Sequence, residues 1–262
     1  NFINRKFNKY IGEIENSKDD ISCEKKAGDF SLLVHQKIVR DYINNLTPYR
    51  GLLIYHGLGS GKTCSAIAIA EGIVTDKKIV CMTPAALQMN FFSELKKCGN
   101  PLYKYNQFWE FIETNDDEDL INQLHTILHI SRSSIRKQKG AWFVNVKKEP
   151  NYNTLSNEEH ISLDKQLKEM IKQKYEFINY NGLRLNSLKT KAFFSQAIKK
   201  KQNPFDNHVV IIDEAHNFVS RIVNKMSDKT SISYKLYEYL MSATNARIVL
   251  LSGTPIINRP SE

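Results

Sequence analysis

Four short and nearly continuous apolar runs occur along the chain, and each one ends in polar or glycine-rich residues. They lie at residues 51–55, 78–82, 208–212 and 247–251. Strands whose side chains are buried on both faces have this pattern, because none of their positions faces water. The pattern therefore predicts an α/β fold with a mainly parallel sheet and helices on both faces. Since ligands bind at the carboxyl ends of such strands, the residues that follow each run are the first candidates for a functional site.

The segments outside these runs give weaker signals. Residues 33–43 space their apolar positions like an amphipathic helix, and residues 141–146 and 175–180 are expected to form strands. Between about 100 and 205 the pattern loosens, which predicts a lysine-rich insertion into the domain that contains the sheet. One helix face within this insertion is marked by Leu163, Leu167, Met170 and Ile171. Residues 1–30 are polar and mixed in charge, and we interpret them as an N-terminal extension.

A glycine-rich turn follows the first apolar run and precedes a stretch of small apolar residues typical of a helix. It reads Gly57-Leu58-Gly59-Ser60-Gly61-Lys62-Thr63. Backbone N–H groups in such a turn wrap an anionic phosphate, and the helix N-terminus adds partial positive charge. This P-loop pattern predicts that Lys62 reaches the β- and γ-phosphates of ATP and that the Thr63 hydroxyl binds Mg²⁺. His56 stands where the usual pattern has a glycine, and Gly57 and Gly59 can supply the flexibility that the loop needs.

Two adjacent carboxylates, Asp213 and Glu214, follow the apolar run at 208–212. Mg²⁺ takes oxygen ligands and keeps several waters, so Asp213 is expected to hold this ion through water. Glu214 is expected to orient and deprotonate the attacking water. The small residues from Ser252 to Pro255, after the last run, are expected to hydrogen-bond the carboxylates and to sense the γ-phosphate. Together with the glycine-rich turn, these residues predict half of a Mg²⁺–ATP hydrolysis site.

Composition narrows the choice of partners without deciding it. The 262-residue chain carries a net charge of +9 and has a pI near 9.2, which favours polyanions, nucleic acid first. A lysine-rich solvated surface explains the same charge. Positive charge is densest at residues 131–139 and 197–201, which form either part of a nucleic-acid track, a docking site for a polymerase subunit, or solvated loops. No apolar run reaches the ~18 residues of a membrane span, so no membrane partner is expected.

The four cysteines show no pairing or metal-binding pattern. None forms a CxxC pair or a zinc-type cluster with histidine, so we expect a reducing, intracellular compartment and no structural metal. Cys64 and Cys81 lie in apolar segments and are expected to be small core residues.

Three of these elements together resemble motifs I, II and III of superfamily 2 helicases and translocases. They are Lys62-Thr63, the DEAH-type box Asp213-Glu214-Ala215-His216, and Ser252-Gly253-Thr254-Pro255, which is similar to the Swi/Snf-like branch. Residues 83–94 resemble motif Ia. The segments LLIYHGLGSGKTCSAIAIAEG, YEFINYNGL and VVIIDEAHNFVSRIVNK are similar to the helicase-like NTPases of large DNA viruses, a group that includes the poxvirus early transcription factor small subunit and nucleoside triphosphatase I. The resemblance covers roughly residues 32–262.

The resemblance implies a RecA-like P-loop NTPase domain that couples ATP hydrolysis to movement along nucleic acid. Gln36 lies where a glutamine that reads adenine is expected, and His216 and Thr254 are assigned to the nucleotide site. The resemblance also implies nucleic-acid contacts, with DNA favoured over RNA, by Thr83, Pro84, Asn90, Asn179, Tyr180 and Asn181. Short polar side chains suit this task because they hold phosphates without reading sequence. Tyr180 is expected either to stack on a base or to be a core aromatic residue at a strand end.

The expected organisation is an N-terminal extension at 1–30 and the ATP-binding domain at 31–262, with its insertion at about 100–205. Enzymes of this kind need a second RecA-like domain that carries arginine fingers, and this chain has no room for it. The chain also begins at Asn1 rather than at Met, which indicates a fragment or a processed piece. Since arginine fingers raise turnover ~10³–10⁵-fold, the isolated piece is expected to bind ATP and to hydrolyse it weakly.

The leading hypothesis is the ATP-binding half of an ATP-dependent nucleic-acid helicase or translocase, viral and linked to transcription. Its expected partners are nucleic acid, the second RecA-like domain, and RNA polymerase or another transcription subunit. Its expected location is inside the cell, in the virion and the host cytoplasm. Two alternatives remain open: the motor subunit of a restriction system, and a nucleotide-dependent assembly module that recruits RNA polymerase without translocating.

Overall fold

The chain divides into two compact units in the computed structural model, which describes residues 5, 7–13, 32–44, 46–57, 59–73, 77–182 and 202–254. We call Val39–Phe91 with Tyr175–Glu262 the sheet unit. We call Asn1–Ile38 with Phe92–Lys174 the hairpin unit. Two helices contain the boundaries between the units, α2 (Val34–Tyr42) and α4 (Gln88–Cys98).

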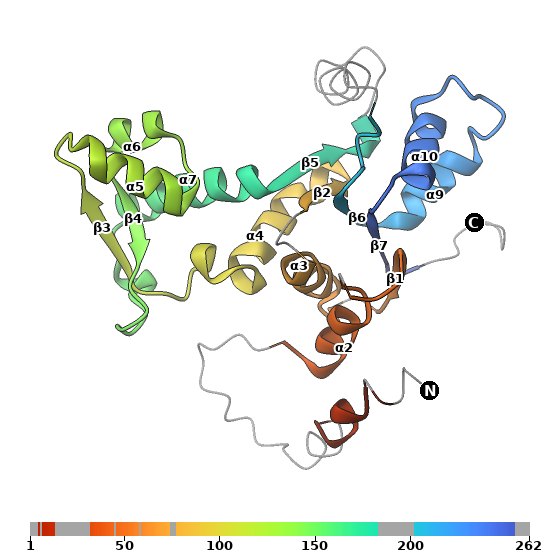
Figure 1. Cartoon of the computed structure of the whole chain (residues 1–262), viewed down its shortest axis with the longest axis horizontal. Helices are drawn as coiled ribbons and strands as arrows, with labels where there is room; N and C mark the ends of the chain where they lie inside the picture. Colours follow the sequence, from red (N-terminus) through yellow and green to blue (C-terminus); the bar gives the residue numbers. More distant parts are fainter. Residues whose placement is uncertain are drawn as a thin grey trace. The chain divides into compact units, whose positions relative to one another are not determined.

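A five-stranded parallel sheet forms the centre of the sheet unit, in the order β1-β7-β6-β2-β5 (Figure 1). Its strands are Gly51–Tyr55 (β1), Lys78–Thr83 (β2), Tyr175–Asn179 (β5), His208–Ile212 (β6) and Arg247–Ser252 (β7). The four apolar runs of the sequence are β1, β2, β6 and β7, which confirms the expected parallel sheet. The strand expected at 175–180 is β5. Because all five strands run in the same direction, their carboxyl ends share one edge of the sheet.

Helices flank this sheet, as the apolar runs predicted. They include α3 (Lys62–Ile73), α9 (Ala215–Val223) and α10 (Ile232–Ser242). Alternate side chains of a strand point to opposite faces. On one face, strand and helix residues form a shared cluster of Val80, Met82, Val210, Ile212, Phe218, Ile222, Leu236 and Leu240. The intervening strand residues are also buried, among them Ile79, Cys81, Val209 and Ile211, and α3 contacts β6 and β7.

Strand β1 departs from the expectation of burial on both faces. Ile54 is 2% exposed, but Leu53 is 49% and Tyr55 is 59% exposed. The expectation was therefore wrong for this strand. The physical reason is its position, since among the described residues β1 pairs with β7 and lies at the edge of the sheet. An apolar run predicts a strand but cannot tell a central strand from an edge strand.

The hairpin unit is built around two antiparallel strands, β3 (Trp109–Glu113) and β4 (Gly140–Val144). Its helices include α5 (Glu118–Leu128), α6 (Arg132–Gln138) and α7 (Asn157–Lys174), with short 3₁₀ turns η2 (Pro101–Tyr103) and η3 (Tyr152–Thr154). The sequence predicted β4, but it did not predict β3. The predicted helix face of α7 is confirmed by the burial of Leu163, Leu167, Met170 and Ile171.

Most of the basic run at 131–139 is helical in this unit. Ser131 caps α6 by accepting a hydrogen bond from the Ser134 amide. Arg136 forms an ion pair with Glu118 at 2.8 Å, and Arg132 donates from Nε to Asn122 Oδ1 at 2.7 Å. The alternative of a solvated loop therefore does not describe this run, although its charged side chains lie at the surface. The second basic run, at 197–201, lies outside the described residues.

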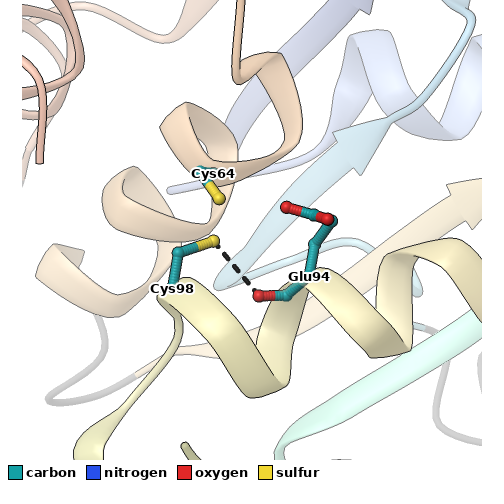
Figure 2. A group of neighbouring side chains, drawn as sticks. All are labelled: Cys64, Glu94 and Cys98. Carbon is teal, nitrogen blue, oxygen red and sulfur yellow. Dashed lines mark hydrogen bonds between the residues drawn. The ribbon is translucent and has the colours of Figure 1, made fainter. Parts of the chain in front are cut away.

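Cys64, Cys81 and Cys98 lie in the part of the chain that the structure describes, and all three are buried within a helix or strand. In the sheet unit, Cys64 is 5% and Cys81 is 0% exposed, which confirms that they are small core residues. In the hairpin unit, Cys98 Sγ at the end of α4 lies 3.2 Å from the backbone carbonyl oxygen of Glu94 (Figure 2).

Candidate nucleotide-binding site

The glycine-rich turn lies between β1 and α3, at the carboxyl edge of the parallel sheet. Gly59 has φ 77° and Gly61 has φ 75°, a left-handed backbone that side chains disfavour. These two glycines therefore allow the tight turn that leads into α3. The helix begins at Lys62, and Thr63 follows in its first turn with a partly buried side chain.

Polar groups of the turn bind the turn itself. The Lys62 ammonium donates to the carbonyl oxygens of His56 at 2.9 Å and Gly57 at 3.0 Å. The Ser60 hydroxyl also donates to the Gly57 carbonyl, at 2.8 Å. An anionic phosphate is a stronger acceptor for an ammonium group than a backbone carbonyl is. Lys62 can therefore exchange these weaker acceptors for a phosphate.

Asp213 and Glu214 lie immediately after β6, in an unusual local backbone. Asp213 extends the ladder, since its N–H donates to the Met82 carbonyl at 2.9 Å. Glu214 has φ 48° and ψ 52°, which for a residue with a side chain costs about 1–2 kcal/mol. The Glu214 N–H donates to Asp213 Oδ1 at 3.0 Å, and the Glu214 carboxylate makes no capping hydrogen bond to α9. The acidic pair is therefore not explained by helix capping.

The Asp213 carboxyl is held in an unfavourable environment for its charge. Burial, followed by repulsion from Glu214, raises the pKa of Asp213 to about 6. The Glu214 N–H and the positive charges of Lys62 and His216 oppose this rise only in part. Asp213 therefore differs from a carboxylate in a structural ion pair, whose pKa the paired cation would lower.

The third motif completes the cluster. His216 Nδ1 lies 3.0 Å from Ser252 Oγ and 3.4 Å from Glu214 Oε2. The Thr254 amide donates to Ser252 Oγ at 3.1 Å. A Cβ atom added to Gly253 would lie 3.6 Å from Lys62 Nζ, so the third motif also touches the glycine-rich turn. Three segments far apart in the sequence thus meet at one edge of the sheet. Pro255 lies outside the described residues.

Most of the residues expected to contact nucleic acid gather at the ends of β2 and β5. Thr83 and Asn179 are register partners, and Asn179 Nδ2 donates to Gln88 Oε1 at 3.2 Å. Thr83 Oγ1 and Asn179 Oδ1 are buried without a hydrogen-bond partner. Pro84 is buried, whereas Asn90 and Asn181 are exposed. This edge therefore carries both exposed amides and buried polar atoms that remain unsatisfied.

Tyr180 is placed differently from its neighbours. Its side chain is 2% exposed, and its hydroxyl donates towards the backbone carbonyls of Asp213 at 2.9 Å and Glu214 at 3.0 Å. A buried ring offers no face to a base in this structure, so the alternative of a core aromatic residue describes Tyr180 better. No local pattern indicated its contact with the acidic turn, because the two segments are more than thirty residues apart.

Gln36 belongs to the hairpin unit, on α2. It is 2% exposed, and its Oε1 accepts a hydrogen bond from the Leu33 amide at 2.9 Å. Its role as a reader of adenine stays a prediction.

Comparisons with known proteins show which proteins this chain is similar to. No protein-family model matches the chain. A protein of Acanthamoeba polyphaga mimivirus named "Putative ATP-dependent RNA helicase" is 30% identical over 264 residues, which cover 100% of this chain. The homologues of this chain are thus viral proteins named helicases or NPH-I homologs, which supports a relationship to the helicase superfamily of large DNA viruses.

Other viral relatives have a lower sequence identity to this chain. A "Putative helicase" of invertebrate iridescent virus 3 is 24% identical over 88% of the chain. A "Termination factor NPH-I homolog" of African swine fever virus is 25% identical over 81% of the chain. The chain spans 36% of the mimivirus protein, 19% of the iridescent virus protein and 21% of the African swine fever virus protein. Among the residues that the structure describes, no helix is both long and apolar enough to cross a membrane.

Proposed function

We propose that this chain binds ATP with Mg²⁺ and hydrolyses it as part of a helicase or translocase that acts on nucleic acid. The observation that carries the proposal is the meeting of three motifs at one sheet edge. Lys62 lies against Gly253, His216 lies against Ser252, and the charge of Lys62 acts on Asp213. No structural need explains why a lysine, two carboxylates and a histidine should gather there.

The phosphates of ATP would take the place of the carbonyl oxygens that Lys62 now contacts. The N–H groups of the turn from Gly57 to Gly61 and the Ser60 hydroxyl would surround them. Thr254 would sense the γ-phosphate. The lysine therefore moves from a weak acceptor to a strong one when ATP binds, which favours closure of the turn.

The residues at this edge fit Mg²⁺ by the chemistry of their donor atoms. Thr63 would hold the ion through its hydroxyl, and the Asp213 carboxylate would hold it through water, and both supply the oxygen chemistry that Mg²⁺ requires. The raised pKa of Asp213 agrees with this assignment, because a cation would relieve the unfavourable charge. A bound Mg²⁺ neutralises charge on the phosphates.

Glu214 is the proposed general base. Its carboxylate is 28% exposed and makes no helix cap, so a water molecule can reach it. His216 lies 3.4 Å from this carboxylate and 3.0 Å from Ser252. The histidine thereby connects the base to the third motif, and a change at the γ-phosphate could reach Glu214 through it.

Nucleic acid would bind at the ends of β2 and β5. The exposed amides of Asn90 and Asn181 are suitable donors to phosphate oxygens, and Thr83, Pro84 and Asn179 lie beside them at the same edge. We propose DNA as the track, with a role in viral transcription inside the infected cell, and with RNA polymerase or another transcription subunit as a partner. A relative that is named a termination factor supports the link to transcription.

The test is ATP turnover of the protein with single-stranded DNA, duplex DNA and RNA as activators. We expect both forms of DNA to stimulate turnover more than RNA does. The variant Asn90→Ala should require more DNA for half-maximal stimulation, whereas Met89→Ala, at an exposed neighbouring position on α4, should behave like wild type. Stimulation by RNA alone would overturn the choice of DNA. Turnover that no nucleic acid alters would support a nucleotide-dependent assembly module instead.

A further inference from the structure

Tyr180 forms the first position of the 3₁₀ turn η4 (Tyr180–Gly182), directly after β5. Its hydroxyl lies 2.9 Å from the Asp213 carbonyl oxygen and 3.0 Å from that of Glu214. Burial, followed by the charges of Asp213 and Glu214, raises the pKa of Tyr180, so this hydroxyl stays protonated and remains a donor. One side chain from a distant strand end therefore contacts the backbone of both acidic residues.

Helix α9 holds Tyr180 from the opposite side. The Tyr180 ring packs edge-on against Phe218, with the ring centroids 5.5 Å apart. Arg221, one turn further along the helix, donates to the Tyr180 carbonyl at 2.6 Å and to the Asn181 carbonyl at 3.3 Å. The backbone of η4 is thus fixed by an arginine, while the hydroxyl of the same residue is directed at the acidic turn.

The contact matters because the Glu214 backbone is left-handed. The direction of the Glu214 side chain depends on this strained conformation, and other contacts must hold it in place. The Glu214 carbonyl accepts from the Asn217 amide at 2.9 Å, as the first hydrogen bond of α9, and also from Tyr180. Asp213 is fixed by its amide bond to Met82. Tyr180 is the described side chain that reaches both carbonyls at once.

We propose that Tyr180 is a positioning residue that holds the Asp213–Glu214 turn in its left-handed conformation, and that Arg221 holds Tyr180 in place. Tyr180 acts through the backbone and touches no reacting atom. The inference rests on the proposed function in one respect, namely that Glu214 is the general base whose direction controls turnover.

The experiment uses the full chain with Tyr180→Phe, which removes the donor and keeps the buried ring. We expect kcat for ATP hydrolysis to fall about 10-fold, the effect of losing one hydrogen bond that orients the base. The KM for ATP should stay unchanged, because the glycine-rich turn is not altered. Tyr234→Phe on α10 is the matched control, since it removes a hydroxyl from the same unit away from the acidic turn, and it should keep the wild-type kcat.

Arg221→Gln tests the second half of the inference. It should lower kcat in the same direction, because it releases the carbonyls of Tyr180 and Asn181. The double variant should be no slower than the slower single variant, since the two residues act as one unit. Additive losses would overturn the assignment of Arg221.

Hydrogen exchange of the protein without ATP separates this inference from the proposed function. Tyr180→Phe should speed exchange of the Asn217 amide, whose acceptor is the Glu214 carbonyl, and leave the amides of β6 and β7 unchanged. Absence of turnover in wild type would overturn the proposed function, while faster exchange at Asn217 would still support the positioning of the turn. A variant with the wild-type kcat and wild-type exchange would overturn the inference. Faster exchange across the whole sheet would do so too, because it would mean a general loss of stability.

Discussion

The carboxyl edge of the sheet unit and the interior of the hairpin unit treat polar groups in opposite ways. At the sheet edge, Asp213 has a raised pKa and Glu214 has a strained backbone. In the hairpin unit, Lys96 is almost fully buried, and it forms an ion pair with Asp164, which also accepts from Tyr105 at 3.1 Å. The sheet edge compensates its charges only in part, whereas the hairpin unit pairs them.

Two further side chains, Gln166 and Glu169, show how complete the pairing is in the hairpin unit. The buried Gln166 accepts from the Trp142 amide at 2.8 Å and donates to the Trp142 carbonyl at 2.7 Å. Glu169 accepts from the Ser131 amide and from the Ser134 hydroxyl. The difference teaches where to look for function. Strain and unsatisfied charge persist where a ligand is expected to relieve them, whereas satisfied networks serve stability.

The pKa values of Asp164 in the hairpin unit and Asp213 at the sheet edge are shifted in opposite directions. Burial alone would raise the pKa of Asp164, but hydrogen bonds from Lys168 and Lys96 more than offset it, so its pKa lies below 3.8. Asp164 therefore contributes stability that is present above pH 3.8 and is lost as the pH falls through its folded pKa. Asp213, with a folded pKa of about 6, is protonated more readily in the folded state. Its ionisation lowers stability as the pH rises from 3.8 through about 6.

The largest effect expected at the sheet edge is on nucleotide binding. Lys62→Ala removes the ammonium that would bind the phosphates, so the affinity for ATP should fall about 100-fold, the loss of two charged hydrogen bonds. Isothermal titration with ATP and Mg²⁺ measures this change. Lys97→Ala, at an exposed position of α4 in the hairpin unit, is the control and should bind ATP like wild type. Equal ATP affinities for wild type and Lys62→Ala would mean that the glycine-rich turn is not part of the nucleotide-binding site.

In the hairpin unit, the largest expected effect is on stability. Asp164→Asn leaves the Lys96 ammonium buried without an anion, which should lower the free energy of unfolding by about 2–3 kcal/mol. Chemical denaturation measures it. Glu118→Gln is the matched control, because its pair with Arg136 is exposed, and it should change stability by less than about 0.5 kcal/mol. If both variants lose the same free energy of unfolding, the buried Lys96–Asp164 pair stabilises the protein no more than the exposed Arg136–Glu118 pair does.

A smaller effect of opposite sign is expected at the sheet edge. Asp213→Asn keeps the size of the side chain and removes the buried charge, so at pH 7 the free energy of unfolding without nucleotide should rise by about 1–2 kcal/mol. The gain should shrink below about pH 6, where Asp213 becomes protonated in the folded protein. Thermal melts at pH 5 and pH 7 measure both statements, with the exposed Glu149→Gln as control. A variant less stable than wild type at pH 7 would mean that Asp213 is a structural residue.

Local patterns predicted much of the sheet unit. Four apolar runs located β1, β2, β6 and β7, and their polar ends located Lys62, Asp213 and Ser252, because strand, turn and helix follow each other directly there. The exposure of Tyr55 could not be predicted, since the position of β1 in the sheet depends on pairing between distant segments. The burial of Tyr180 was left open for the same reason. Its partners lie in the acidic turn after β6 and on α9, and no local pattern records that contact.

The hairpin unit was less predictable. The face of α7 was visible because its apolar residues recur at helical spacing. Strand β3 alternates weakly, and Asn151 contributes to holding it in place by accepting from the Trp109 amide at 2.7 Å, a contact between distant residues. The basic residues at 131–139 were interpreted only as a region of positive charge, so the helix there was not predicted. This helix begins at the Ser131 cap. The role of Arg221 was also missed, because a single arginine on a helix gives no signal in one sequence.

The central claim is that Glu214 is the general base of an ATP hydrolysis site at the sheet edge. The most direct measurement compares ATP binding and ATP turnover of wild type and Glu214→Gln, with Glu149→Gln as the matched control. The account predicts that Glu214→Gln binds Mg²⁺–ATP like wild type and loses turnover about 10²–10⁴-fold, the usual effect of removing a general base. Wild-type turnover in Glu214→Gln would contradict the account.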